Sequence, residues 1–218
     1  MSRGPLITFE GSEGCGKSTQ VKRLLARLQR EGIPVVVTRE PGGTTIGEKI
    51  RHLLQFDGES AAMTPEAELL LFSASRAQLV REVIEPARAR GEVVISDRFF
   101  DSTTVYQGIA RKLSLETVAA LNRFAVGAAI PDVTFLLDLD VETARARMQR
   151  RVRPVQAADR MEGEPPEFYE RVVAAYRALA AAEPARICVV DAGRSVDVIA
   201  AEIWATLSSR MTFPAAVH

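Results

Sequence analysis

The feature that most constrains the fold is a glycine-rich segment near the start of the chain, residues 11–19. It reads GSEGCGKST and matches the pattern GxxxxGK[ST] of phosphate-binding loops. A short apolar run over residues 6–9 precedes it, and apolar residues at helical spacing over 21–28 follow it. In such a strand–loop–helix arrangement, backbone N–H groups converge on phosphate oxygens and the helix N-terminus adds partial positive charge. The segment therefore predicts a nucleoside triphosphate site.

Two side chains of this segment have specific expected roles. Lys17 is expected to reach the outer phosphates, and the hydroxyl of Ser18 is expected to bind Mg²⁺. Contacts with the nucleotide are expected along the whole segment, from Gly11, Ser12, Glu13, Gly14, Cys15, Gly16, Lys17, Ser18 and Thr19.

Charge and composition bound the kinds of partner. The 28 basic and 28 acidic side chains of this 218-residue chain cancel, so bulk attraction to nucleic acid or to a membrane surface is not expected. No apolar run approaches the length of a membrane span. The two cysteines, Cys15 and Cys188, lack metal-ligand spacing, and a disulfide at Cys15 would interfere with the phosphate loop. These features favour a protein of the reducing cytoplasm with no nucleic-acid or membrane partner.

Strand and helix patterns alternate along the whole chain. Continuous apolar runs, typical of parallel strands covered on both faces, indicate strands at 6–10, 34–38, 93–95, 133–137 and 187–190. Helical patterns separate them, with a break expected near Gly108 and a restart at Ser114 as N-cap. The chain is therefore expected to form one α/β domain over residues 1–218, a five-stranded parallel sheet with helices on both faces.

Polar clusters follow four of these strands, at residues 11–18, 39–43, 97–98 and 191–193. In an open parallel sheet, ligands bind beyond the carboxyl ends of the strands. The four clusters are therefore expected to form one site.

The end of the third strand indicates the class of reaction. The chain has no Asn-Lys-x-Asp tetrad for reading guanine, and the strand ends in Asp97-Arg98 rather than the Asp-Glu usual in motor ATPases. Asp97 can hold Mg²⁺ through water, and Arg98 can clamp an acceptor phosphate through two hydrogen bonds. Such a clamp is useful only if phosphate passes to a second substrate. The pattern favours a small-molecule kinase.

Further residues carry a resemblance to a known family, the thymidylate kinases. It rests on the segment REPGGT at 39–44 and, in order, on Phe72, Arg76, Asp97, Arg98, Ser102, Tyr106, Gln107 and Gly108, and it extends from Phe9 to about Gly193. The resemblance implies the fold of P-loop nucleoside monophosphate kinases with a short lid. It also implies transfer of the γ-phosphoryl group of ATP to dTMP, giving dTDP for dTTP synthesis, with Mg²⁺, by a homodimer.

The resemblance assigns roles around the acceptor. Phe72 would stack on thymine, and Arg76, four residues on and hence on the same helix face, would donate to a thymine carbonyl. Arg98 would hold the dTMP phosphate, with Arg39 as a second clamp. Tyr106 would crowd the 2′ position of the sugar.

Other acceptor contacts are assigned less specifically. Glu13 would approach the 3′-hydroxyl of the acceptor. Glu40 would either orient Arg39 or approach the metal, and a solvated loop acid is the alternative. The remaining contacts with acceptor are assigned to Pro41, Ser102, Thr103 and Gln107.

A lid is expected over residues 147–166, which are charged and poor in apolar anchors. Family members without an arginine in the phosphate loop carry catalytic arginines on the lid, and this chain has that pattern. Arg151 and Arg153 are expected to contact the transferred phosphoryl group, and Arg145, Arg147 and Ala192 are expected to contact the ATP. A solvated basic face or a nucleic-acid patch is the alternative interpretation of these arginines.

Two other functions remain open from the sequence. One is a kinase of another nucleoside or deoxynucleoside monophosphate, which the base pocket would distinguish. The other, from a different class, is a P-loop ATPase that switches a protein partner, against which the clamp residue Arg98 argues. The homodimer interface is expected from apolar helical faces at 69–84 and 121–126, although periodicity does not separate interface from core.

Overall fold

The computed structural model describes residues 3–56, 62–150 and 163–213. Its centre is a parallel sheet of five strands in the order β2-β3-β1-β4-β5. This confirms the predicted fold class. The strands are β1 (Leu6–Glu10), β2 (Val35–Arg39), β3 (Val93–Asp97), β4 (Val133–Asp138) and β5 (Ile187–Asp191).

Helices connect the strands, and several begin at a side-chain N-cap, as at Thr44, Asp140 and Ser195. None of the described helices is long and apolar enough to cross a membrane. The helices are α1 (Lys17–Arg30), α2 (Thr45–Gln55), α3 (Pro65–Leu79), the π-helical η2 (Val80–Ile84), α4 (Glu85–Ala89), α5 (Phe100–Thr103), the π-helical η3 (Thr104–Ala110), α6 (Leu115–Val126), α7 (Val141–Gln149), α8 (Pro166–Ala182) and α9 (Val196–Arg210).

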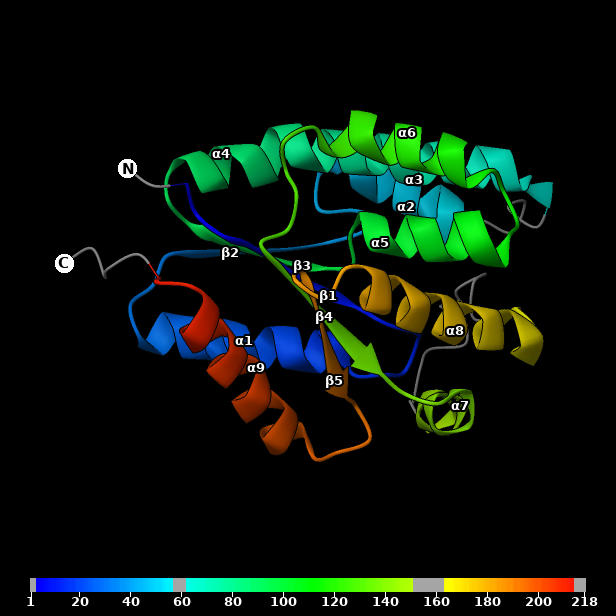
Figure 1. Ribbon diagram of the computed structural model, residues 1–218. Coiled ribbons are helices and arrows are strands. Elements are labelled where there is room, and N and C mark those ends of the chain that lie inside the picture. The colour runs from blue at the N-terminus through cyan, green and yellow to red at the C-terminus, as the bar shows by residue number, and fades with distance from the viewer. Residues whose placement is uncertain (1–2, 57–61, 151–162, 214–218) are drawn as a thin grey trace.

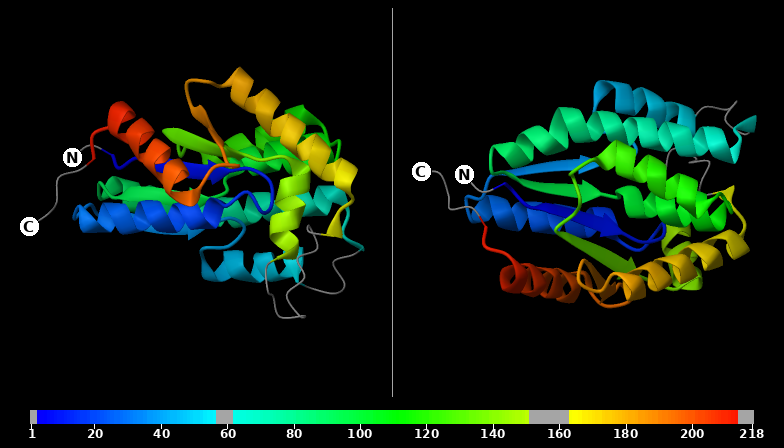
Figure 2. Two further views of the ribbon diagram at one scale, coloured as in Figure 1. Left: turned by 90° about the horizontal axis from the view of Figure 1, so that it is seen from below. Right: turned by 45° about the horizontal axis from the view of Figure 1, so that its top comes forward.

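The helices cover both faces of the sheet (Figure 1, Figure 2). Strand residues alternate between the faces: Ile7 and Phe9 pack in a cluster with apolar residues of α1 and α9. Leu6 and Val94 belong instead to a cluster with residues of α3, η2 and α4. The central strands β1, β3 and β4 are buried on both faces and are mostly apolar, which is why they could be recognised in the sequence.

The helical region after β3 is interrupted near Gly108, as predicted. Helix η3 continues through Gly108 and ends at Ala110, and α6 begins at Leu115. A Cβ atom at position 108 would lie 2.8 Å from Cδ2 of Leu115, so this glycine allows close helix packing. The restart at Ser114 is confirmed, since its side chain accepts a hydrogen bond from the backbone N–H of Thr117.

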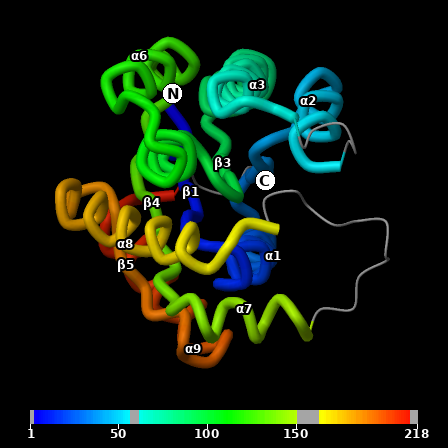
Figure 3. Tube along the Cα trace, turned by 90° about the vertical axis from the view of Figure 1, so that its right-hand side faces the viewer, coloured from blue at the N-terminus to red at the C-terminus, as the bar shows by residue number. Residues whose placement is uncertain are grey.

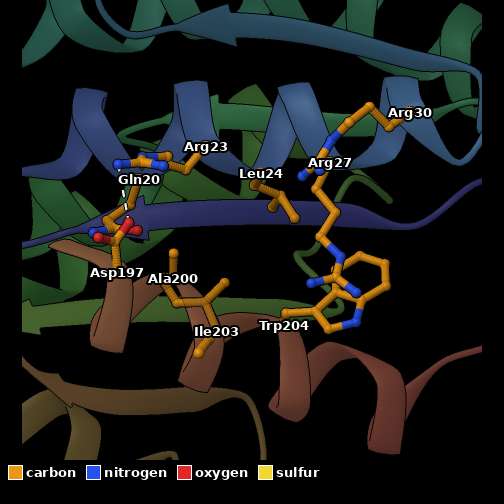
Figure 4. Close-up of a pocket in the computed structure, with 10 residues that line it drawn as sticks. Gln20, Arg23, Leu24, Arg27, Arg30, Asp197, Ala200, Ile203 and Trp204 are labelled. Atoms are coloured by element: carbon orange, nitrogen blue, oxygen red, sulfur yellow. Dashed lines mark ion pairs between the residues drawn. The ribbon is translucent and has the colours of Figure 1, made fainter.

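Helices α1 and α9 pack side by side and leave a groove between them (Figure 4). The guanidinium of Arg27 lies 4.1 Å above the ring of Trp204, and Arg23 forms a 3.0 Å ion pair with Asp197. Both arginines therefore have partners within the fold, and we interpret these contacts as helix packing.

All strands run in the same direction, so their carboxyl ends meet at one edge of the sheet. Figure 3 looks toward that edge, with α7 and α8 lying around it. The phosphate loop after β1 and the Asp97-Arg98 pair at the end of β3 lie on neighbouring strands there. This edge positions the site.

Candidate active site

The phosphate loop joins β1 to α1 and packs tightly against its neighbours. Gly11 and Gly14 have φ values of 134° and 78°, which favour glycine. A Cβ atom on Gly11 would lie 2.6 Å from the carbonyl oxygen of Leu137, and one on Gly14 would lie 2.5 Å from that of Ala144. Glycine at both positions therefore allows the loop to lie against β4 and α7.

The interior of the loop suits a triphosphate. Lys17 Nζ donates to the carbonyl oxygens of Gly11 at 3.0 Å and Ser12 at 2.8 Å. The buried hydroxyl of Ser12 has no hydrogen-bond partner among the described residues. Gly16, the N-cap of α1, supplies no capping side chain, so the first N–H groups of a 14-residue helix face an anion site.

The two predicted metal ligands lie in contact. Ser18 Oγ donates to Asp97 Oδ2 at 2.6 Å. Mg²⁺ prefers oxygen ligands and takes most of its shell from water and substrate phosphates, so a hydroxyl and a carboxylate beside a phosphate loop suit this ion.

A cleft that is partly open to solvent lies beside the loop. All of its lining residues except Gln55 are predicted substrate-binding residues. The structure therefore places these predicted residues around one cleft. The cleft is lined by Glu13, Pro41, Gln55, Phe72, Arg98, Ser102, Thr103, Tyr106 and Gln107. No ligand contact is tested by this geometry, so the individual roles stay predictions.

Arg98 is one of the residues that line the cleft. Its φ of 72° places a non-glycine residue in the left-handed region, a strain that is often found at functional sites. Its Nη2 donates to Glu13 Oε1 at 2.6 Å, and its Nη1 donates to Ser102 Oγ and to the carbonyl oxygen of Gly11, both at 3.0 Å. The guanidinium is therefore held at the boundary between phosphate loop and cleft.

Glu13 is the acidic partner of Arg98. Burial raises the pKa of its carboxyl, but the nearby charges of Arg98 and Lys17 and a hydrogen bond from Tyr106 together lower that pKa below its ordinary value of 4.5. The Tyr106 hydroxyl donates to Glu13 Oε2 at 2.6 Å. Glu13 is thus ionised at neutral pH and compensates the arginine in the absence of substrate.

Two further residues that sequence reasoning missed hold this cluster in place. Glu10, at the end of β1, accepts from the backbone N–H of Phe99 at 2.7 Å, from Ser102 Oγ at 2.6 Å and from the Tyr176 hydroxyl at 2.8 Å. Burial and the nearby Asp101 raise the pKa of Glu10. A buried carboxylate just before a phosphate loop was a usable signal, whereas nothing in the sequence marks Tyr176 on α8.

Arg76 is hydrogen-bonded to the cleft residue Thr103, and its own side chain is 1% exposed. Its Nε and Nη2 donate to Glu40 Oε2 at 2.8 and 2.6 Å, and its other contacts include Asn122 Oδ1 and Thr103 Oγ1. Burial raises the pKa of Glu40 to about 7, opposed by Arg76. The predicted contact of Arg76 with thymine is untested, and in this structure the guanidinium is paired within the protein.

The expected pairing of Glu40 with Arg39 is wrong, as is its alternative role as a solvated loop acid. Glu40 is buried and pairs with Arg76. Arg39 instead forms two 2.9 Å hydrogen bonds with Glu48 on α2 and is half exposed. Arg39 does not line the cleft, so its role as a second phosphate clamp stays a prediction.

The remaining predicted donor-side residues lie apart from this cleft. Arg145 and Arg147 are on α7. Ala192, after β5, is fully buried, and its N–H donates to the carbonyl oxygen of Asp138. Arg151 and Arg153, with most of the expected lid, lie outside the described residues.

Comparisons with known proteins show the family of this chain. The family model described as thymidylate kinase matches residues 9–203. A thymidylate kinase of Synechococcus sp. is 49% identical over 205 residues, which make up 94% of this chain and 96% of that protein. Those of Geobacter sulfurreducens and Deinococcus radiodurans are each 47% identical over 210 residues, covering 95% and 96% of this chain and 98% and 99% of those proteins. The parallel five-stranded sheet is the one expected for P-loop nucleoside monophosphate kinases. The chain belongs to the thymidylate kinase family.

Proposed function

We propose that the protein transfers the γ-phosphoryl group of ATP to dTMP and produces dTDP. The observation that carries this proposal is the position of Arg98, which joins the phosphate loop to a cleft that contains Phe72. The names of the similar proteins support thymidylate as the acceptor.

On the donor side, the phosphate loop binds the triphosphate of ATP. Lys17 moves its Nζ from the loop carbonyl oxygens to the outer phosphates, where its charge offsets the charge of the transferred group. Ser18 and Asp97 hold Mg²⁺, which when bound neutralises phosphate charge and orients the donor. Lid arginines, with Arg151 and Arg153 as candidates, complete the charge stabilisation, and Arg145, Arg147 and Ala192 border the nucleotide.

On the acceptor side, Arg98 binds the phosphate of dTMP and Phe72 stacks on the base. Arg98 is already oriented by Ser102 and Glu13, so little side-chain freedom is lost when the phosphate binds. The acceptor is itself an anionic phosphate and needs no strong base. Catalysis then follows from positioning the two phosphates in line and from spreading the charge of the transferred group.

Product analysis tests this function. We expect purified protein with ATP and Mg²⁺ to convert dTMP to dTDP, detected by anion-exchange chromatography, with slower conversion of dUMP and little of dCMP or dGMP. Rapid formation of ADP in all samples, including one without acceptor, would favour an ATPase and contradict the proposal.

We also propose that the protein is a homodimer that associates through α3 and α6. These helices pack together in the outer layer of the molecule (Figure 1). Each exposes a large apolar side chain: Leu70 of α3 is 55% exposed, and Phe124 of α6 is 82% exposed. Covering them by a second copy would remove apolar surface from water.

The cytoplasm is the proposed compartment. Cys15 is a free thiol inside the phosphate loop, and its Sγ lies 3.6 Å from Lys17 Nζ. Oxidation there would add polar oxygen atoms beside the lysine that binds phosphate, so a reducing environment protects the site.

A further inference from the structure

One side chain of the cleft, Gln107, is held from behind by a buried carboxylate. Glu68 of α3 is 1% exposed, and its Oε1 accepts a hydrogen bond of 2.7 Å from Gln107 Nε2. Glu68 does not line the cleft, whereas Gln107 does, beside Phe72 and Thr103. The hydrogen bond to the amide of Gln107 therefore connects Glu68 to the cleft.

Arg111 holds Glu68 from the other side. Its Nε and Nη2 each donate to the carboxylate of Glu68 at 3.3 Å, and its Nη2 also lies 2.5 Å from Glu164 Oε1. The guanidinium lies 4.9 Å from the ring centre of Phe168 on α8. A buried carboxylate with such a partner keeps its charge compensated and its position fixed.

This arrangement determines which end of the Gln107 amide faces the cleft. An ionised carboxylate can only accept hydrogen bonds, so the NH₂ group of the amide must point toward Glu68. The carbonyl oxygen, Oε1, is then the end left for the cleft. Among the described residues no hydrogen bond to this oxygen is found. The cleft thus presents an acceptor at this position.

An acceptor distinguishes between pyrimidine bases. Thymine and uracil carry an N–H donor at position 3, whereas cytosine has a lone pair there. A cytosine ring in the same position would place two acceptors against each other and leave both without a hydrogen bond, which is a strong source of discrimination.

We propose that Glu68, braced by Arg111, is a positioning residue that fixes the Gln107 amide with Oε1 toward the base and thereby selects pyrimidines with an N–H at position 3. The inference rests on the proposed function, because it requires the cleft to bind a pyrimidine nucleotide. A purely structural Glu68 would affect all acceptors alike.

The test compares dUMP with dCMP, two acceptors that both lack the 5-methyl group. In Glu68→Gln the new amide can donate or accept, so Gln107 is free to turn. We expect the ratio of kcat/KM for dUMP to that for dCMP to fall about 10-fold or more, mainly through KM for dUMP. Glu68→Asp keeps the charge beside Arg111 but withdraws the carboxylate from Gln107, and it should lower the ratio as well if the first variant does not fold.

Two controls isolate the proposed coupling. Glu164→Gln weakens the ion pair between Arg111 and Glu164 and does not alter the hydrogen bond between Glu68 and Gln107. It should leave the ratio of kcat/KM for dUMP to that for dCMP unchanged. In a Gln107→Met background, Glu68→Gln should cause no further loss of selectivity, because the two residues act as one unit.

The outcomes separate the inference from the function on which it rests. If wild-type protein phosphorylates dTMP but the folded Glu68 variants keep the wild-type ratio, or lose activity equally with both acceptors, the inference is wrong. If the wild-type protein phosphorylates no pyrimidine nucleotide, the proposed function itself is wrong.

Discussion

Arg76 and Glu40 form the most buried ion pair of the cleft region, with side chains 1% and 3% exposed. Removing one partner of such a pair leaves an uncompensated charge in the interior. We predict that Arg76→Met lowers the free energy of unfolding by about 3–5 kcal/mol, measured by urea denaturation. Arg39→Met is the matched control, because the ion pair of Arg39 with Glu48 is half exposed. This substitution should lower the free energy of unfolding by no more than about 1 kcal/mol. Equal losses in the two variants would contradict this account.

Glu13 gives the site a stability that depends on pH. Its pKa is lower in the folded protein than its ordinary value of 4.5, so its ionised form stabilises the fold above about pH 4.5. This contribution is lost as the pH falls through the lowered folded-state pKa. We predict that Glu13→Gln flattens the decline of unfolding free energy between pH 5 and pH 3, followed by urea denaturation at each pH. If the free energy of unfolding depended on pH in the same way in the variant and the wild type, the stabilising contact between Glu13 and Arg98 would be contradicted.

At the residue scale, the sequence indicated which side chains gather but not how they pair. Arg98 was predicted from its position at the end of a strand, and the family resemblance predicted Phe72, Tyr106 and Gln107. All four line one cleft. The partner of Arg76 lies 36 residues away on another element, and no local pattern fixes such a contact. Burial explains why Arg76 pairs with Glu40. A buried guanidinium must form its hydrogen bonds with groups of the protein, because water does not reach it.

The phosphate loop shows how one element depends on its neighbours. Gly14 has a positive φ, and a side chain there would clash with the backbone of α7. We predict that Gly14→Ala costs at least about 1–2 kcal/mol of stability from backbone conformation alone and weakens ATP binding, measured by calorimetry. Gly163→Ala is the control, because a Cβ at that position meets nothing within 4 Å. Unchanged ATP affinity in Gly14→Ala would contradict the tight fit of the loop.

The strands and the start of α6 could be predicted because their signals are local. Continuous apolar runs marked the strands, and Ser114 is an N-cap as expected. The π-helical form of η3 could not be predicted, because no local sequence pattern identifies it. The low helix propensity of glycine located the end of this helical region only approximately, since η3 continues through Gly108 to Ala110.

On the scale of the whole molecule, the parallel direction of the strands places the groups proposed for catalysis at one edge of the sheet. The neighbours β1 and β3 bring Ser18 and Asp97, 79 residues apart, into hydrogen-bond contact. Alternation of strands and helices predicted this edge, but the order of the strands required the structure.

The outer face of α3 and α6 is the proposed interface of the homodimer. We expect light scattering after gel filtration to give the mass of a dimer for the wild-type protein and a shift toward monomer for Phe124→Asp, because a carboxylate would be buried at the interface. Val198→Asp, on α9, is the control and should remain dimeric. A wild-type monomer, or a dimer unaffected by Phe124→Asp, would contradict this interface.

The central claim is that Arg98 binds the phosphate of the acceptor in a thymidylate kinase reaction. Its most direct test is ADP release with ATP and Mg²⁺, coupled to NADH oxidation, for wild type and Arg98→Ala with and without dTMP. We predict rapid release that requires dTMP in the wild-type protein and a loss of about 10²–10³-fold in the variant. Release that is independent of dTMP, or an Arg98→Ala variant as active as the wild type, would contradict the account.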